Sequence, residues 1–471
     1  MKTGLRRGLL GLLGAAILVG IPLAILAVES SRRGLGLGQM VALMVARTVA
    51  PRTGLESMSR SILPPGPRSD FLVPKAAGDP AADRPRIAHV CPVDLDKDGL
   101  LDILVCDCLA NRVSWIRQHP RGEFTETALA DVLAPAHARA VDMDGDGDLD
   151  VLVASMGTLW TSNDKVGAVV VLENDGHMRF TRRVILDGIA RVTDVNAADL
   201  NGDGRLDLAV VEFGYDDGET RWLENLGGWQ FRSHILQSLS GPINAEIADM
   251  NGDGHPDIVT LVSQEWEEIY IFLNDGKGGL RPKMIYGSSN EDFGSSWIAV
   301  VDMNRDGRPD ILYSNGDAFD YLPPRPRPWH GVQWLENLGE AGFAVHRIVD
   351  LAGASSPQAV DLNGDGHLDV AVVSEYNLWE RPDAQSLIWL ENDGRLRFAR
   401  HDVTATPTHL VTLGVGDFDG DGQPDLVTGG LHVYPPYDRL SRVTVWYNRW
   451  PGSTDQVPTG AGASGSPAPG P

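Results

Sequence analysis

One nine-residue pattern, Asp-x-(Asp/Asn)-x-Asp-Gly-x-x-Asp, occurs seven times in this chain and constrains its fold more than any other feature. Successive copies begin roughly fifty residues apart, which is the size of one four-stranded blade of a β-propeller. Each copy lies between two short apolar runs, and Gly, Asn and Asp separate the remaining apolar segments, as expected of strands joined by turns. The pattern predicts an all-β chain that folds as a seven-bladed β-propeller with four-stranded blades. The copies start at Asp94, Asp142, Asp199, Asp249, Asp302, Asp361 and Asp417.

The last repeat is one strand short. In most earlier units a strand ending in Asn is followed by a Gly turn and a fourth strand that opens on an aromatic residue, whereas the seventh unit runs from Asn448 into the C-terminal tail. An open sheet edge would favour aggregation. The extended segment before the first repeat, Ser69–Pro74, is available to cover it. We therefore predict that this segment closes the ring as the outer strand of the seventh blade.

Oxygen-bearing side chains alternate along each loop as a calcium site requires. Calcium takes six to eight hard oxygen ligands and tolerates irregular geometry. Positions 1, 3 and 5 supply carboxylate or amide oxygens, Gly at position 6 permits a sharp turn, position 7 offers its backbone carbonyl, and position 9 adds a carboxylate. Metal-free Asx turns are the alternative, but they would leave the acids of each loop repelling one another.

These loops predict up to seven structural Ca²⁺ ions. No Glu at position 12 and no flanking helical periodicity accompany them, so they are not EF-hands. The predicted ligands, with position 7 acting through its carbonyl, are Asp94, Asp96, Asp98, Leu100, Asp102, Asp142, Asp144, Asp146, Asp148, Asp150, Asp199, Asn201, Asp203, Arg205, Asp207, Asp249, Asn251, Asp253, His255, Asp257, Asp302, Asn304, Asp306, Arg308, Asp310, Asp361, Asn363, Asp365, His367, Asp369, Asp417, Asp419, Asp421, Gln423 and Asp425.

The loops and the strands around them resemble those of FG-GAP/VCBS repeat proteins, whose blades are similar to those of integrin α-subunits. The resemblance covers residues 86–450. It implies that each Asp-rich loop joins the first and second strands of its blade and holds calcium. The family includes adhesion proteins, lectin-like proteins and some lyases and dehydratases, so the resemblance does not identify the ligand.

Charge narrows the choice of partners. The formal net charge is −24, and the acids are concentrated in the repeated loops. Such a chain repels phosphates, so we expect no nucleic-acid partner.

The N-terminus reads as a targeting segment. Lys2, Arg6 and Arg7 precede an apolar run, Gly8–Val28, which as a helix is long enough to cross a bilayer core. An uncleaved anchor with the N-terminus inside would attach the protein to the membrane, and a cleaved signal peptide would release it; both place the repeats outside the cytoplasm. We therefore predict a single-pass membrane-anchored or a secreted or periplasmic protein. The predicted segments are a signal peptide or hydrophobic anchor helix at 1–28, a linker with a short interfacial helix at 29–67, the propeller at 68–450 and a disordered tail at 451–471.

Three cysteines flank the first Asp-rich loop. Cys91 precedes it, and Cys106 and Cys108 follow it. If the loop joins antiparallel strands, an exported chain can form one disulfide here and retain one thiol. Three partly buried thiols are the alternative.

The loops between second and third strands should lie on the propeller face opposite the Asp-rich loops. They differ in length, and most carry an aromatic residue beside charged residues. Such groups recognise sugars or peptides through stacking and directional hydrogen bonds, although loop aromatics also pack on one another. The predicted ligand-binding residues are Trp160, Tyr215, Trp266, Phe319, Tyr321, Trp329, Tyr376, Trp379, Tyr434 and Tyr437.

Two functions follow. The first is an extracytoplasmic binding or adhesion module for carbohydrate or protein. The alternative is a calcium-stabilised propeller enzyme acting on polysaccharide, of the lyase or sugar dehydratase type, for which His330 with Asp317 or Asp320 is the candidate acid–base pair. No nucleophile elbow, P-loop or metalloprotease motif occurs. The binding module is therefore the main prediction.

Overall fold

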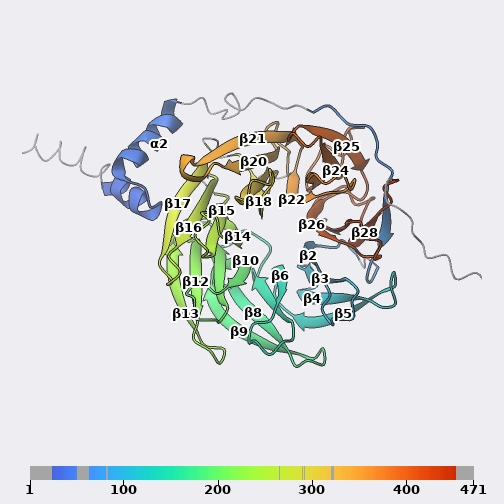
Figure 1. Ribbon diagram of the computed structural model, residues 1–471, viewed down its shortest axis with the longest axis horizontal. Coiled ribbons are helices and arrows are strands. Elements are labelled where there is room, and N and C mark those ends of the chain that lie inside the picture. The colour runs from blue at the N-terminus through green and yellow to red at the C-terminus, as the bar shows by residue number, and fades with distance from the viewer. Residues whose placement is uncertain are drawn as a thin grey trace, which may run out of the picture.

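The computed structural model describes residues 24–49, 63–80, 83–264, 266–288, 290, 292–319 and 323–451. The repeats form seven four-stranded antiparallel sheets arranged as blades around a central axis (Figure 1). This confirms the predicted seven-bladed, nearly all-β propeller, and a short helix at residues 24–32 precedes it.

In blades 1 to 6 the strands follow one another from the axis outward in chain order, and in blade 7 the outermost strand is the first strand of the chain. Blade 1 comprises β2 (Ile87–Val93), β3 (Asp102–Asp107), β4 (Arg112–Gln118) and β5 (Phe124–Asp131). Blade 2 comprises β6 (Pro135–Val141), β7 (Asp150–Ser155), β8 (Gly167–Asn174) and β9 (Phe180–Ile189). Blade 3 comprises β10 (Arg191–Ala198), β11 (Asp207–Phe213), β12 (Glu219–Asn225) and β13 (Phe231–Gln237). Blades 4 and 5 comprise β14 (Pro242–Ala248), β15 (Asp257–Val262), β16 (Glu268–Asn274), β17 (Leu280–Gly287); and β18 (Ser295–Val301), β19 (Asp310–Asn315), β20 (Gly331–Asn337), the 3₁₀ turn η1 (Gly339–Ala341), β21 (Phe343–Asp350). Blades 6 and 7 comprise β22 (Ala354–Val360), β23 (Asp369–Ser374), β24 (Leu387–Asn392), β25 (Phe398–Thr404); and β26 (Leu410–Gly416), β27 (Asp425–Gly430), β28 (Val443–Asn448), β1 (Leu72–Ala76).

Burial changes with distance from the axis. The second strands, such as β7 and β15, are buried along their whole length, because neighbouring blades cover both faces of them. The fourth strands alternate partly buried and exposed residues, as in β5, because they lie at the outer rim and have a neighbouring strand on one side only. The core is therefore a series of apolar layers between blades, such as the layer in which Leu104 and Val113 of blade 1 meet Val151 and Val170 of blade 2.

Strand β1 closes the ring. It pairs antiparallel with β28, with Leu72 opposite Asn448 and Ala76 opposite Thr444, so it is the outer strand of blade 7. Just before it, the ring of Phe71 packs edge-on against Trp389, with ring centroids 5.1 Å apart. The prediction from the missing fourth strand is confirmed, and N-terminal and C-terminal chain meet in one sheet (Figure 1).

The N-terminal helical segment contacts the outside of blade 4. Helix α2 (Leu37–Val49) follows the helical residues 24–32, and Arg33 between them is 2% exposed. The Arg33 Nε lies 3.1 Å from an Oε1 of the equally buried Glu268, and its guanidinium lies 4.2 Å from the ring centroid of Trp266. Arg33, within the segment predicted as a linker, therefore anchors this helical segment to the propeller.

The predicted ends of the chain fall mostly outside the described residues. Residues 1–23 of the predicted anchor or signal peptide, and residues 452–471 of the predicted tail, are not described. In the described part of the chain, no helix combines the length and the apolar character that a membrane crossing needs.

The three cysteines are free thiols. Cys91 pairs in register with Leu104, and the residue opposite Cys106 is His89. The strand register therefore keeps Cys91 away from the position that a disulfide with Cys106 requires. Of the two alternatives, a disulfide with one remaining thiol or three thiols, the structure contains three thiols.

Candidate functional site

Each Asp-rich loop joins the first and second strands of its blade and is closed by its first aspartate. In blade 6, Asp361 Oδ1 accepts a hydrogen bond from the Gly364 amide and Oδ2 accepts one from the Gly366 amide, both at 2.8 Å. Gly366 has a φ of +88°, in the left-handed region that glycine adopts without steric cost. The aspartate at position 1 thus fixes the turn, and the glycine permits it.

The aspartate at position 9 is the first residue of each second strand and is almost completely buried. In all seven blades it accepts a hydrogen bond from the backbone amide of the last residue of the third strand, as Asp369 does from Asn392 at 2.8 Å. In six of the blades its other oxygen accepts the amide of position 2, as Asp369 does from Leu362 at 3.2 Å, and Asp207 of blade 3 is the exception. Position 9 therefore ties the loop to the third strand, besides its predicted place among the calcium ligands.

The recurring Asn at the end of the third strand also makes hydrogen bonds to the Asp-rich loop and to the following turn. The Asn392 side chain donates to the carbonyl of Leu368 at position 8 of the loop, and its oxygen accepts the amides of Gly394 and Leu396 in the turn to the fourth strand. The sequence pattern marked this Asn only as a strand end. Its recurrence as the last residue of the third strand in six blades was the signal of the contact.

Three loops gather carboxylates as a hard cation requires. Within each of these sets the oxygens lie within 4.8 Å of one another: Asp94, Asp96 and Asp102; Asp142, Asp144 and Asp146; and Asp417, Asp419 and Asp425. In the other four loops position 3 is Asn, so an amide oxygen replaces one carboxylate. The donor set, all oxygen and mostly anionic, fits calcium.

The loops differ in the cations that already contact them. Arg117 lies 2.6 Å from Asp96 in blade 1, and Arg449 lies 2.5 Å from Asp419 in blade 7. In the described part of the chain, no Lys or Arg side chain pairs with the carboxylates of the blade 2 loop, where burial and then neighbouring carboxylates raise the pKa of Asp144. The blade 2 loop carries five aspartates, and Lys97 of the blade 1 loop donates to its Gly147 carbonyl.

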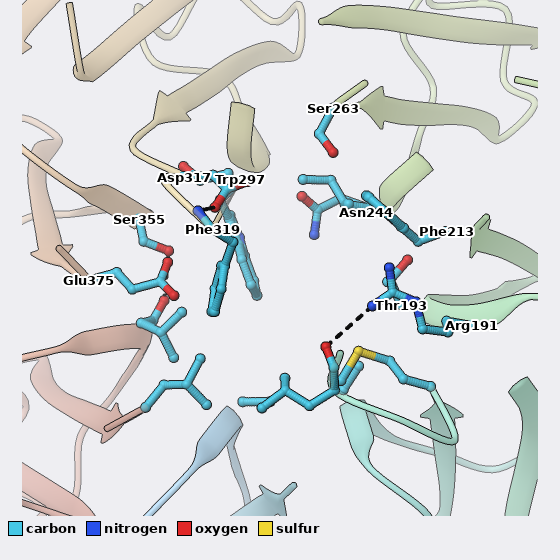
Figure 2. A pocket seen from close by; sticks show the side chains of 18 of the residues that line it. Arg191, Thr193, Phe213, Asn244, Ser263, Trp297, Asp317, Phe319, Ser355 and Glu375 are labelled. Atoms are coloured by element: carbon cyan, nitrogen blue, oxygen red, sulfur yellow. Dashed lines mark hydrogen bonds between the residues drawn. The ribbon is translucent and has the colours of Figure 1, made fainter. Parts of the chain in front are cut away.

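The opposite face holds a cavity of about 490 Å³ on the propeller axis (Figure 2). All seven first strands contribute to its wall, together with the loops between second and third strands. Its aromatic lining includes Phe213, Trp297 and Phe319, and polar groups such as Asn244 and Ser355 lie between them (Figure 2). This volume lies within the range of small-molecule binding sites.

Two acids lie on one side of the cavity. Glu375 is 4% exposed, and burial together with the neighbouring charge of Asp317 raises its pKa to about 8. Asp317 accepts the amide of Phe319 at 2.9 Å (Figure 2). At neutral pH Glu375 therefore keeps its proton and presents a carboxylic acid.

One arginine lies on the other side. Arg191, the first residue of β10, is 5% exposed, and its guanidinium packs over the ring of Phe213 at 4.6 Å. Its Nη1 donates to the Leu159 carbonyl at 3.3 Å, and its Nε has no hydrogen-bond partner. Burial lowers the pKa of Arg191 to about 10, so the guanidinium is still charged at neutral pH.

A ring of polar side chains surrounds the axis five residues before each Asp-rich loop. Four of these side chains link their blade to the adjacent one by accepting a backbone amide: Asp194 from Ala245 at 3.0 Å, Ser356 from Leu413 at 3.1 Å, Thr412 from Val90 at 3.3 Å and His89 from Ala138 at 3.5 Å. The members of this axial ring are His89, His137, Asp194, Asn244, Trp297, Ser356 and Thr412.

The predicted ligand-binding residues divide between cavity and core. Trp160, Tyr215, Phe319 and Tyr434 line the cavity, and the first two are 51% and 43% exposed. The others are packed: Tyr376 and Trp379 are buried, Trp266 contacts Arg33, Trp329 donates to the Asp292 carbonyl and Tyr437 stacks with Arg84. Tyr321 lies outside the described residues.

The candidate acid–base pair is not assembled in the described structure. His330 is 1% exposed and is not among the residues that line the cavity, and its Nδ1 faces the amides of Arg327 and Gly353 at 3.4 and 3.3 Å. Burial lowers its pKa to about 3. Asp317 lines the cavity, and Asp320 lies outside the described residues.

The sequence reasoning missed Arg191, Asn244, Trp297 and Glu375 as cavity residues. Arg191 lies eight residues before an Asp-rich loop, and Asn244 and Trp297 share an offset of five residues, where the first strand of a blade reaches the axis. That offset is readable in the sequence once the loops are aligned.

Comparisons with known proteins agree with this architecture. The FG-GAP-like repeat family matches more than half of the chain, at residues 94–153, 142–210, 199–260, 249–313 and 361–428. Human integrin alpha-7 is 35% identical over 83 residues, which are 16% of this chain and 7% of that protein. A T-cell immunomodulatory protein homolog of Plasmodium falciparum is 29% identical over 136 residues, which are 27% of this chain and 18% of that protein. Both relatives are thus matched over less than a fifth of their length.

Among solved structures, BBS1N in complex with ARL6DN is similar with a TM-score of 0.44 and 12% identity, over 81% of this chain and 97% of that chain.

Proposed function

Because this chain belongs to the FG-GAP-like repeat family, we propose that it is an extracytoplasmic binding module whose axial cavity takes a carbohydrate ligand. The observation that carries the proposal is the cavity itself, with its aromatic walls and its hydroxyl and amide groups (Figure 2). Aromatic faces stack on sugar rings, and fixed polar groups select their hydroxyls. A protein ligand is the other outcome of the test below.

In this proposal the Asp-rich loops hold calcium and stabilise the scaffold. The side chains at positions 1, 3, 5 and 9 and the position 7 carbonyl would be the ligands, supported by the three carboxylate clusters. Bound calcium would offset the mutual repulsion of the loop acids. Calcium is abundant outside cells, which fits the targeting signals of the N-terminus.

The test is a glycan array, with a surface-protein panel beside it, probed with calcium-loaded protein. We expect selective glycan binding that Trp297→Ala weakens at least about tenfold, because this ring lines the cavity. Trp229→Ala is the matched control, since Trp229 lies in the turn between the third and fourth strands, at the Asp-loop end of blade 3. Binding to proteins alone, or equal loss in both variants, would contradict a carbohydrate site in the cavity.

The enzyme alternative has no supporting geometry in the described residues, because its candidate His330 does not reach the cavity. We therefore propose binding without turnover.

A further inference from the structure

The side chain of Arg191 is unusual among the buried cations of this protein. Arg33, the other buried arginine among the described residues, pairs with Glu268. The partly exposed Arg139, near the axis, has Glu246 at 3.0 Å and Asp194 at 3.7 Å. Across the residues that the structure describes, no carboxylate pairs with Arg191. A buried charge without a counter-ion is costly, so its position in a cavity wall points to an anionic ligand.

The surroundings of Arg191 leave its donors available. The Phe213 ring covers the face of the guanidinium, and the Leu159 carbonyl takes Nη1. Figure 2 shows the guanidinium beside Thr193 at the edge of the cavity, on the side opposite Glu375. A guanidinium held flat on an aromatic ring presents its N–H groups in the plane that a carboxylate matches.

The rest of the cavity fits the body of a sugar acid better than a purely apolar acid. Trp297 and Phe319 lie between the arginine and the two acids and offer stacking surfaces (Figure 2). Asp317, Glu375 and Ser355 on the far side offer acceptors and donors suited to hydroxyl groups. Asp317 would repel a ligand carboxylate placed on its side of the cavity. An acidic ligand would therefore bind with its carboxylate toward Arg191.

We propose that Arg191 is the anion-recognising residue of the axial cavity and that the cavity's ligand is a sugar acid, a pyranose that carries one carboxylate. This inference rests on the proposed carbohydrate-binding function and specifies its ligand class. Arg191 sets the specificity for charge, whereas the aromatic walls contribute affinity for the ring.

The test compares uronic-acid oligosaccharides with their methyl esters, which keep the shape of the sugar and lose the charge. Isothermal titration calorimetry on calcium-loaded full-length protein should give the free acid an affinity about 10- to 100-fold above that of the ester, the range of a charge-assisted hydrogen bond. Arg191→Gln should abolish this preference, and Arg191→Lys should keep part of it. Arg232→Gln is the matched control, because it removes an arginine of the same blade whose side chain is 59% exposed.

Melting temperature separates recognition from structure. Removing an unpaired buried charge should leave the melting temperature of Arg191→Gln unchanged or higher, while the acid preference disappears. A lower melting temperature with equal loss of acid and ester binding would show a structural role and overturn the inference.

The remaining outcomes are also decisive. Equal affinity for acid and ester in the natural protein would overturn the inference and leave carbohydrate binding standing. Tighter binding of an N-acyl amino acid than of any uronic-acid oligosaccharide would assign the carboxylate to another class of ligand and overturn the sugar-acid proposal. Failure of every sugar, acidic or neutral, to bind would remove the proposed function itself.

Discussion

The two faces of this propeller differ in how similar the contributions of the seven blades are. On one face, seven nearly identical loops repeat the same hydrogen bonds, from the position 1 carboxylate to the turn and from position 9 to the third strand. On the other face, the seven first strands and their neighbouring loops contribute different side chains to one cavity. Each repeated loop makes its hydrogen bonds within its own blade, whereas the variable side chains of all seven blades line one shared cavity. The Asp-rich loops and the proposed binding cavity therefore lie at opposite ends of the same strands.

The largest effect is expected from removing the strand that both faces depend on. Deleting residues 66–78 removes β1 and exposes the edge of β28, so the protein should aggregate or fail to fold. Size-exclusion chromatography and thermal unfolding measure this. Deleting residues 459–471, an equal length of the C-terminal segment, is the control. A monomeric deletion variant with an unchanged melting temperature would show that the ring does not need this closure.

Calcium removal should act on the Asp-loop face. EDTA should lower the melting temperature by ~10 °C, because each saturated site adds a few kcal/mol to the free energy of unfolding and because repulsion among the acids returns. Below that transition, ligand affinity in the cavity should change little, since the cavity lies at the other end of the strands. Differential scanning calorimetry with and without calcium checks the first expectation. An unchanged melting temperature in EDTA would show that calcium does not stabilise the protein through these loops.

Single substitutions within one loop sharpen the same comparison. Asp369→Ala should lower the free energy of unfolding by about 2–4 kcal/mol even in EDTA, because two buried amides lose their acceptor. Asp365→Ala, at the exposed tip of this loop, should cost less in EDTA and instead reduce the stabilisation by calcium. Urea unfolding under both conditions measures the two effects. Equal costs in EDTA would show that position 9 has no special structural role.

The smallest effect is expected at the cavity face and depends on pH. Folding raises the pKa of Glu375 from an ordinary value of 4.5 to about 8, so the native protein holds a proton that the unfolded chain has lost. This contribution to stability is complete below pH 4.5 and declines as the pH rises to about 8. Glu375→Gln cannot lose a proton there, so it should stabilise the protein at pH 8 and have little effect at pH 4.5.

Thermal unfolding of Glu375→Gln at these two pH values, with the exposed Glu380→Gln as control, measures that effect. The same gain at both pH values would mean that Glu375 does not hold its proton through burial.

Much of the scaffold could be predicted from the sequence, because the features that define it lie close together in the chain. The pattern from Asp361 to Asp369 contains its own turn, its own ligands and the start of the next strand within nine residues. The missing fourth strand of the last repeat identified β1, since a sheet edge has to be covered. The strand register was not readable in this way: the pairing of Val93 with Asp102 beside the loop places Cys91 opposite Leu104 and so decides against the disulfide.

Of the site, the sequence by itself determined the seven loops and the face on which variable aromatics gather, because both follow from the order of strands in one blade. Only the tertiary structure decided which of those aromatics line the cavity and which, like Tyr376 and Trp379, pack in the core. It also brought Arg191 and Glu375 to opposite sides of one cavity although they are far apart in the chain. Closure of the ring puts residues from seven separate repeats around one axis, and no contact between neighbouring residues encodes that meeting.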